Sequence, residues 1–312
     1  MWWWLTTALA MGPGPAADAG GPSGRRARAF PLEEPLDLER LRETGDVPLL
    51  AELPTRGRLG PLRLRVGRQK TPFLASYLED LRSVPMVQRP LSTTALDADR
   101  MVGGRAQWSR GPVALTAAAG HPDNLRGFAW DLQGRGEIHV GSLHLGAGTS
   151  RGQHRRFAPR VIVADRFRWF EAESKDALVQ RSSADVSWNP APLRLDVEAA
   201  TLRAGKGRRP LQLQSAAAGL AVMLTGEHRP VGRRIQPKKS WDPARGQLGA
   251  LELATRYEAL QGLGQEQFRV DQLSLGLTSH PLVSVRLPLV WSRAWMGPRT
   301  EDRVMLRVAV DR

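Results

Sequence analysis

The chain has 312 residues, a formal net charge of +14 and no cysteine. Without cysteine it cannot form disulfides, a thiolate nucleophile or a cysteine-ligated zinc site. Only five of the 45 basic residues are lysines. This preference for arginine fits recognition of phosphate or carboxylate groups, which the planar guanidinium binds through two hydrogen bonds. The arginine codons of a GC-rich genome explain the composition equally well.

The first 19 residues resemble a secretory signal peptide. An apolar stretch at residues 2–11 is followed by a small-x-small cleavage site at residues 17–19, although no basic residue precedes the apolar stretch. We expect residues 20–59 to form an N-terminal segment. That segment can contribute the first strands of the fold, at 25–33 and 46–53.

From residue 60 onward the dominant hydrophobic period is two. In residues 62–66 leucine and valine alternate with Arg63 and Arg65, so one face of the strand is apolar and the other basic. The same alternation recurs at 191–203, 248–259, 271–279, 283–291 and 303–312. It predicts half-buried antiparallel strands. The longest apolar stretch in this region, 215–224, is shorter than the roughly 20 residues of a membrane-spanning helix.

The connections between these strands are of two kinds. Short turn signals lie at 110–112, 189–192 and 279–282, and long polar segments lie at 71–101, 152–178 and 227–245. Short turns on one rim and long loops on the other are typical of outer-membrane barrels, whose strands are apolar outside and polar inside. One segment does not fit, because 227–245 falls on the rim of the short turns.

We therefore predict an all-β fold over residues 60–312. It is a transmembrane antiparallel β-barrel of about 14 strands (range 12–16), with short periplasmic turns and longer extracellular loops. About 12 of these strands follow residue 60, and the even total is the one with which bacterial barrels close. A soluble β-sandwich also alternates, and it remains the structural alternative.

Four segments carry a resemblance to a known family. The strand beginning at residue 62 ends in VGRQKTPF (66–73) and is followed by a loop that contains LEDLRSVPMVQRPL (78–91). The later segments are LTGEHRP (224–230), GALELATRYEAL (249–260) and LSLGLTSHPLVSVRLPLVWSR (273–293). In this order they resemble segments of the phosphate-selective porins of the O/P type.

The resemblance implies an anion-selective porin in the outer membrane of a Gram-negative bacterium. Such a protein forms a water-filled channel for small anions such as phosphate, sits in outer-membrane lipid and assembles as a homotrimer. The resemblance also places a constriction near the 66–73 motif and the loop after it. The candidate residues there are Lys70, Arg82, Arg89 and Arg100.

An anion pore needs positive charge on its lumen side. Strand parity gives the lumen candidates Arg63, Arg65, Arg286 and Arg307. Arg194 and Arg256 share that parity, but acidic residues stand beside them. Ion pairing is the favoured interpretation at these two positions, with Asp196 and Glu198 for Arg194 and with Glu252 and Glu258 for Arg256.

Other functions are less favoured. We expect no enzyme, because the six histidines lack an H-E-x-x-H spacing and GAGTSRG (146–152) lacks the lysine of a phosphate-binding loop. For the same reasons we expect no metal site and no cofactor. The basic runs at 205–210 and 229–240 suggest nucleic-acid binding, but they lack interleaved aromatics, and we expect no such partner. A non-selective barrel, or one with a plugged lumen, remains an alternative.

Overall fold

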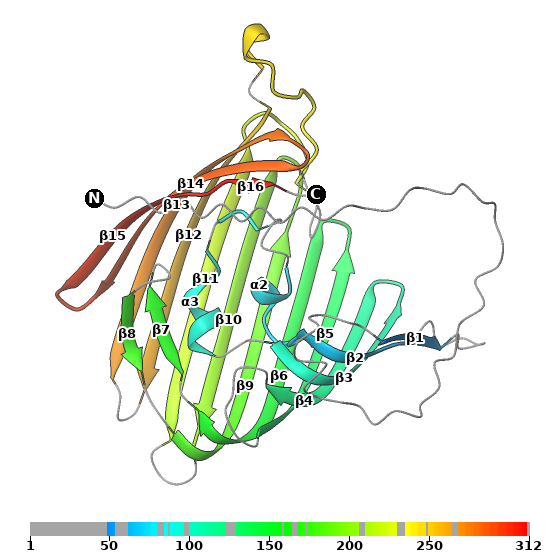
Figure 1. Ribbon diagram of the computed structural model, residues 1–312, viewed down its shortest axis with the longest axis vertical. Helices are drawn as coiled ribbons and strands as arrows, with labels where there is room; N and C mark the ends of the chain where they lie inside the picture. The colour runs from blue at the N-terminus through cyan, green and yellow to red at the C-terminus, as the bar shows by residue number, and fades with distance from the viewer. Residues whose placement is uncertain are drawn as a thin grey trace, which may run out of the picture. The chain divides into compact units, whose positions relative to one another are not determined.

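The computed structural model describes residues 49–53, 62–79, 84–86, 88–96, 100–122, 129–157, 159–163, 167–171, 174–205, 210–229, 235–247, 249–263 and 267–310. The predicted signal peptide (1–19) and the predicted strand at 25–33 lie outside these ranges. Strands make up most of the described chain (Figure 1).

The strands are β1 (Leu49–Leu53), β2 (Leu62–Lys70), β3 (Arg100–Arg110), β4 (Val113–Pro122), β5 (Ala129–Val140), β6 (Leu143–Phe157), β7 (Arg160–Val163), β8 (Phe167–Glu171), β9 (Ser174–Trp188), β10 (Leu193–Ala204), β11 (Leu211–Met223), β12 (Ala250–Leu263), β13 (Phe268–Leu282), β14 (Val285–Met296), β15 (Arg299–Leu306) and β16 (Ala309–Val310). The short helices are α2 (Ala75–Leu78), α3 (Leu91–Ala95) and the 3₁₀ turn η1 (Pro243–Arg245). No helix in the described part of the chain is long and apolar enough to cross a membrane.

Fourteen of the strands form one antiparallel sheet. Neighbours in this sheet follow one another along the chain, except that β6 pairs with β9 and leaves β7 and β8 as a separate hairpin. The last strand, β16, pairs with β14 beyond the end of β15. Within the described ranges no backbone ladder joins β1 to β15. The antiparallel order and the strand number agree with the predicted barrel class.

The apolar face of these strands is the exposed one. On β10, Leu195 and Val197 are 41% and 42% exposed, whereas Arg194 between its apolar neighbours is only 4% exposed. On β13, Leu275 is exposed and Ser274 is buried. A soluble sandwich buries its apolar faces between two sheets, so this arrangement excludes the sandwich. Apolar side chains outside and polar side chains inside are the pattern of a barrel in lipid.

The chain between β2 and β3 folds back over the inner face of the sheet. We call its described residues, 71–79, 84–86 and 88–96, the inner segment. Figure 1 shows its helices α2 and α3 lying in front of the central strands. Its apolar side chains are buried in three clusters with inward residues of the wall. These clusters contain Phe73, Leu74, Tyr77 and Leu96, then Leu91 and Ala95, and then Met86.

Glycine allows the inner segment to approach the wall closely. A Cβ atom on Gly148 of β6 would lie 2.6 Å from the carbonyl oxygen of Phe73, which is shorter than any normal contact. On β13, a Cβ on Gly276 would lie 3.1 Å from the sulfur of Met86. The absence of side chains at these two inward positions therefore helps to fix where the segment rests.

The predicted turn at 279–282 is wrong in position. β13 continues to Leu282, and the chain reverses at residues 283–284. The register of the β13–β14 ladder shifts between Ser279 and Leu282. Pro281 lies in this irregular stretch, where its missing N–H costs no regular ladder bond. Proline therefore marks a bulge here and not a turn.

The ends of two other predicted segments also differ. β6 and β9 extend into the predicted loop at 152–178, and the chain between them contains the β7–β8 hairpin. The predicted strand at 303–312 stops at Leu306 and resumes at Ala309. The alternation of apolar and polar residues identifies the two faces of a strand, but the hydrogen-bonded neighbouring strand determines where the strand ends.

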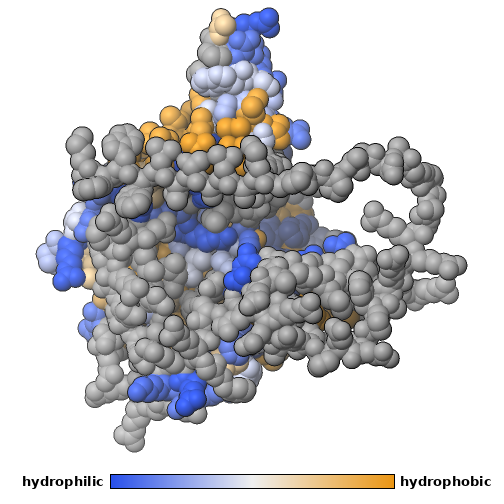
Figure 2. Space-filling model, in the orientation of Figure 1, coloured by the Kyte–Doolittle hydropathy of each residue, from blue (hydrophilic) through white to orange (hydrophobic). Residues whose placement is uncertain are grey.

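The long connection after β11 lies on the rim of the short turns, as its position in the sequence required. Its described residues, 224–229 and 235–247, project beyond the sheet in Figure 1. In Figure 2 the tip of this projection is mostly hydrophilic, and hydrophobic atoms lie at its base. At the base, Arg229 pairs with Glu252 of β12, and Ile235 packs against Met223. Burial lowers the pKa of the Arg229 guanidinium, and the charge of Glu252 opposes that shift.

Candidate functional site

The backbone of the inner segment is hydrogen-bonded to the wall. Four inward arginines donate to its carbonyl oxygens: Arg135 of β5 to Phe73 (3.3 Å), Arg181 of β9 to Leu96 (2.9 Å), Arg256 of β12 to Gln88 (2.7 Å) and Arg286 of β14 to Pro85 (3.0 Å). The carbonyls of an irregular, buried segment need partners outside their own secondary structure. The wall arginines supply those partners, so they position this backbone.

Wall carboxylates bind the opposite kind of backbone group. Glu198 of β10 accepts hydrogen bonds from the backbone N–H (3.0 Å) and the hydroxyl (2.8 Å) of Ser76 at the start of α2. Glu258 of β12 accepts from the backbone N–H of Leu91 at the start of α3. The first N–H groups of a helix have no partner within the helix. The wall therefore caps both short helices.

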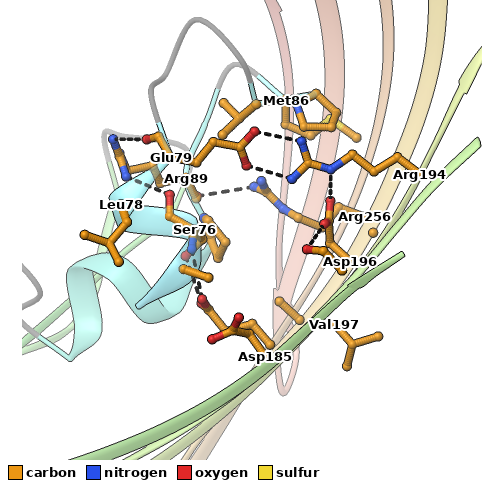
Figure 3. Close-up of a pocket in the computed structure, with 18 of the residues that line it drawn as sticks. Ser76, Leu78, Glu79, Met86, Arg89, Asp185, Arg194, Asp196, Val197 and Arg256 are labelled. Atoms are coloured by element: carbon orange, nitrogen blue, oxygen red, sulfur yellow. Dashed lines mark hydrogen bonds and ion pairs between the residues drawn. The ribbon is translucent and has the colours of Figure 1, made fainter. Parts of the chain in front are cut away.

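An ion pair between Arg194 and Glu79 closes the other end of α2. The two terminal nitrogens of Arg194 each lie 2.7 Å from an oxygen of Glu79, and the Nε atom lies 2.7 Å from Asp196 (Figure 3). The side chains of Arg194 and Glu79 are 4% and 11% exposed. A bidentate pair of this kind has strong geometric specificity, so it fixes the end of α2 against β10.

The predicted ion pairs are partly correct. Arg194 pairs with Asp196, and Arg256 pairs with Glu258, as the sequence suggested. Glu198 instead binds Ser76, and Glu252 binds Arg229.

Two predicted pathway residues gather around Tyr77. Lys70 donates from Nζ to the carbonyl oxygens of Leu78 and Glu79, both at 3.2 Å. Arg89 donates to the carbonyl of Ser76 at 2.7 Å, and its guanidinium carbon lies 4.6 Å from the centre of the Tyr77 ring. Both cations therefore contact the C-terminal carbonyls of α2, where positive charge is favourable.

The remaining predicted residues lie elsewhere. Arg63 and Arg65 of β2 are exposed. In the β-ladder, Arg65 lies opposite Arg105 of β3, and Arg105 lies opposite Ala118 of β4, which is buried. This register places the two arginines on the inner face. Arg100 begins β3 opposite Lys70, Arg286 binds the inner segment, and Arg307 follows β15 close to the charge of Arg286. Arg82 lies outside the described residues.

A pocket of about 310 Å³ lies between the inner segment and the wall (Figure 3). Its charged lining is mixed. The acidic members are Glu79, Glu137, Asp185, Asp196 and Glu198, and the basic members are Arg89, Arg194 and Arg256. Most of these groups already pair with one another or with the backbone of the segment. Most charged groups of the pocket therefore serve to anchor the inner segment to the wall.

Sequence reasoning missed one group on this lining. His139 of β5 and His144 of β6 lie opposite each other across the two-residue turn at 141–142, and Glu137 lies beside them. Their ligand atoms all lie within 4.8 Å of one another, so the group could hold a metal ion. The available signal was the spacing of five residues around a short hairpin turn. The prediction of no metal site considered helical spacing only.

No family model and no curated protein matches the chain. Among solved structures, it is similar to a loop L8 deletion mutant of OmpT, an outer membrane protein of Vibrio cholerae (TM-score 0.52, 13% identity, 81% of this chain and 76% of that one). It is also similar to in-vitro folded OmpT of the same organism in a trimer form (TM-score 0.52, 12% identity, 81% and 77%). At such identities the likeness is one of fold.

These neighbours define the class of protein. The chain has the fold of an outer-membrane antiparallel β-barrel, which confirms the predicted fold class. The predicted location in the outer membrane of a Gram-negative bacterium agrees with that of the neighbours. They do not single out the phosphate-selective porins of the O/P type.

The prediction that the chain is not an enzyme requires correction. It rested on the absence of familiar catalytic motifs. The structural neighbours share the fold at 12% and 13% identity and support no such exclusion. A fold by itself does not decide whether a protein catalyses a reaction. The prediction that the chain is not an enzyme was therefore wrong.

Proposed function

We propose that the protein is a porin that carries small anions such as phosphate across the outer membrane. The observation that carries the proposal is the excess of basic over acidic residues on the inner face of β2, β3 and β4. β2, β3 and β4 contain no acidic residue, and the ladder register places Arg63, Arg65 and Arg105 on their inner face. Glu52 of the short strand β1 lies opposite Arg63. A lumen face with positive charge favours anions over cations.

The position of the inner segment is a second observation that supports this proposal. It is anchored to β5, β9, β12 and β14, while Arg63 and Arg65 on β2 remain exposed. A segment fixed inside the barrel narrows the water-filled space, and charges near a narrow point act on a passing ion with less screening. The VGRQKTPF motif leads directly into this segment, as the resemblance to phosphate-selective porins implied.

The assembly we propose is a homotrimer in outer-membrane lipid. One neighbour of similar fold is described as a trimer form. The exposed apolar side chains that cover the outer face supply a surface for lipid and for neighbouring copies.

A plugged barrel is the second candidate. The observation that favours it is the number of wall strands that the inner segment contacts. Its apolar residues join three buried clusters, and its carbonyls bind arginines from four strands. A segment that is so firmly held can close a lumen as well as narrow it.

Planar-bilayer recording of the detergent-folded protein separates these candidates. We expect single-channel currents whose reversal potential in a salt gradient reports a preference for anions, and a chloride current that added phosphate reduces. Currents without anion preference would retain the pore and overturn its selectivity. A folded, membrane-inserted protein without currents would favour the plugged barrel.

A further inference from the structure

The group formed by Glu137, His139 and His144 has a geometry that the proposed channel does not require. His139 and His144 are opposite partners in the β5–β6 hairpin, and their rings stack with centroids 4.2 Å apart and planes 8° apart. Nε2 of His144 lies 3.5 Å from Oε1 of Glu137 and is buried without a hydrogen-bond partner in the structure. Three good ligand atoms thus converge beside the short turn at 141–142.

The charges around this group are compatible with a bound cation. Glu137 accepts a hydrogen bond from Nε of Arg135 at 2.9 Å, while the two terminal nitrogens of Arg135 bind Asp185 at 2.8 and 2.9 Å. The two carboxylates therefore exceed the one guanidinium by one negative charge. Arg105 is a further positive neighbour of Glu137. With neutral imidazoles, the two carboxylates and the two guanidiniums balance, so the group carries no net positive charge that would repel a metal ion.

The supporting contacts also orient the ligands. A carboxylate or imidazole that binds metal is usually held by a second hydrogen bond, which fixes the direction of its free lone pair. Arg135 provides that bond for one oxygen of Glu137, and Arg135 is itself fixed by Asp185. Glu137 therefore keeps its second oxygen for a ligand. The stacked rings at 4.2 Å also fit neutral imidazoles better than two cations, and neutral imidazole is the form that binds metal.

We propose that Glu137, His139 and His144 bind a divalent transition-metal ion of the zinc class on the inner face of the barrel at the rim of the short turns. Two imidazoles and one carboxylate suit zinc and its first-row neighbours, and they leave a fourth position for water.

Binding requires a small rearrangement of the two rings. Ligands of one zinc ion lie about 2.0–2.2 Å from the metal and hence roughly 3.3 Å from one another, whereas the three ligand atoms here lie within 4.8 Å. A metal also lies near the plane of each imidazole that binds it, so the parallel rings must tilt apart. Side-chain rotation at the end of a hairpin allows this without moving the ladder.

Isothermal titration of the tag-free, detergent-folded protein with zinc chloride tests the proposal. We expect one site in the wild type, a loss of that site in His139→Ala/His144→Ala, and a roughly tenfold or greater weakening in Glu137→Gln. His228→Ala is the matched control, because His228 is exposed and lies in the long connection outside the cluster. This control should bind like the wild type. A heat-modifiability gel shows that each variant is folded.

X-ray absorption of the zinc-loaded wild type provides a readout that needs no variant. The expected first shell has two imidazole nitrogens together with oxygen ligands. A wild type that binds no zinc, a double variant that binds as well as the wild type, or a shell without two imidazoles would each overturn the site. None of these outcomes bears on whether the channel conducts.

Discussion

The β2–β4 wall and the β9–β12 wall face the same interior but use arginine differently. On β2–β4, Arg63 and Arg65 have no acidic residue in their own strand or in the next two, although Glu52 of β1 lies opposite Arg63. On β10 and β12, Arg194 and Arg256 lie between carboxylates and the inner segment, and both are bound to them. On the first wall, Arg65 lies opposite Arg105, so two like charges stand side by side on the inner face. On the second wall, the arginines are bound to carboxylates and to the inner segment, so they hold that segment in place.

This difference shows what an inward arginine can do. Where carbonyls or carboxylates lie within reach, the guanidinium becomes a structural donor and its charge is neutralised locally. Where a second basic residue is the neighbour, as Arg105 is for Arg65, we expect more of the charge to act on ions in the water of the lumen. The following changes test this division, from the largest expected effect to the smallest.

Removal of Arg194 should have the largest effect. Arg194→Ala leaves Glu79 and Asp196 without their buried partner, and breaking such a pair costs about 3–5 kcal/mol. We expect a lower urea midpoint and, in bilayers, a larger and less steady conductance, because the end of α2 is released. Unfolding curves and single-channel recordings measure the two effects.

A double variant controls this test. Arg194→Met with Glu79→Gln removes both charges of the main pair, so it should recover a large part of the lost stability. An equal loss in the single and double variants would show that the pair does not anchor α2.

Gly148→Ala should have the next largest effect. The added methyl would lie 2.6 Å from the carbonyl oxygen of Phe73, a backbone atom that must move. Overpacking of this kind costs typically about 1–3 kcal/mol. The matched control is Gly134→Ala, whose methyl would lie 3.9 Å from its nearest neighbour, Thr149. The control should leave the urea midpoint unchanged or raise it slightly, since alanine has lower entropy than glycine in the unfolded chain.

The predictable part of this molecule follows from alternation. Leu195 and Val197 on one face and Arg194 on the other were enough to predict the strand, its outer face and its lumen face. The pairing of Arg194 with Glu79 was not predictable, because the two residues are 115 positions apart and meet only when the inner segment folds back.

One further signal was present but easily missed. Toward the end of β10 the pattern reverses, since Leu202 is buried and Thr201 and Arg203 are exposed. The reversal occurs where apolar side chains of the inner segment pack on the wall, because Leu202 belongs to the cluster of Phe73. A strand whose inward residues change from charged to apolar thus indicates that something rests on that part of the wall.

Charge reversal at Arg65 should change selectivity without a large change in stability. Arg65 is exposed and faces Arg105 across the ladder, so Arg65→Glu relieves a like-charge contact while it removes positive charge from the lumen. We expect the anion preference, measured by reversal potential, to fall. Lys239→Glu is the control, because this exposed residue lies on the projecting connection. Equal shifts in both variants would show that overall charge, and not the β2–β4 wall, sets selectivity.

Removal of the Arg293–Asp302 pair should have the smallest effect, although its geometry resembles that of Arg194 and Glu79. Arg293 and Asp302 are joined at 2.9 and 2.7 Å, but their side chains are 51% and 46% exposed. The pair lies on the outer face close to the β14–β15 turn, at the rim of the barrel, where lipid headgroups and water solvate both charges when the pair is broken. Water cannot reach the partners of Arg194 in the same way. We therefore expect Asp302→Asn to leave the urea midpoint within experimental error and to leave the conductance unchanged. If this variant loses as much stability as Arg194→Ala, burial is not what distinguishes the two pairs, and the assignment of the inner wall as the anchoring wall would have to be revised.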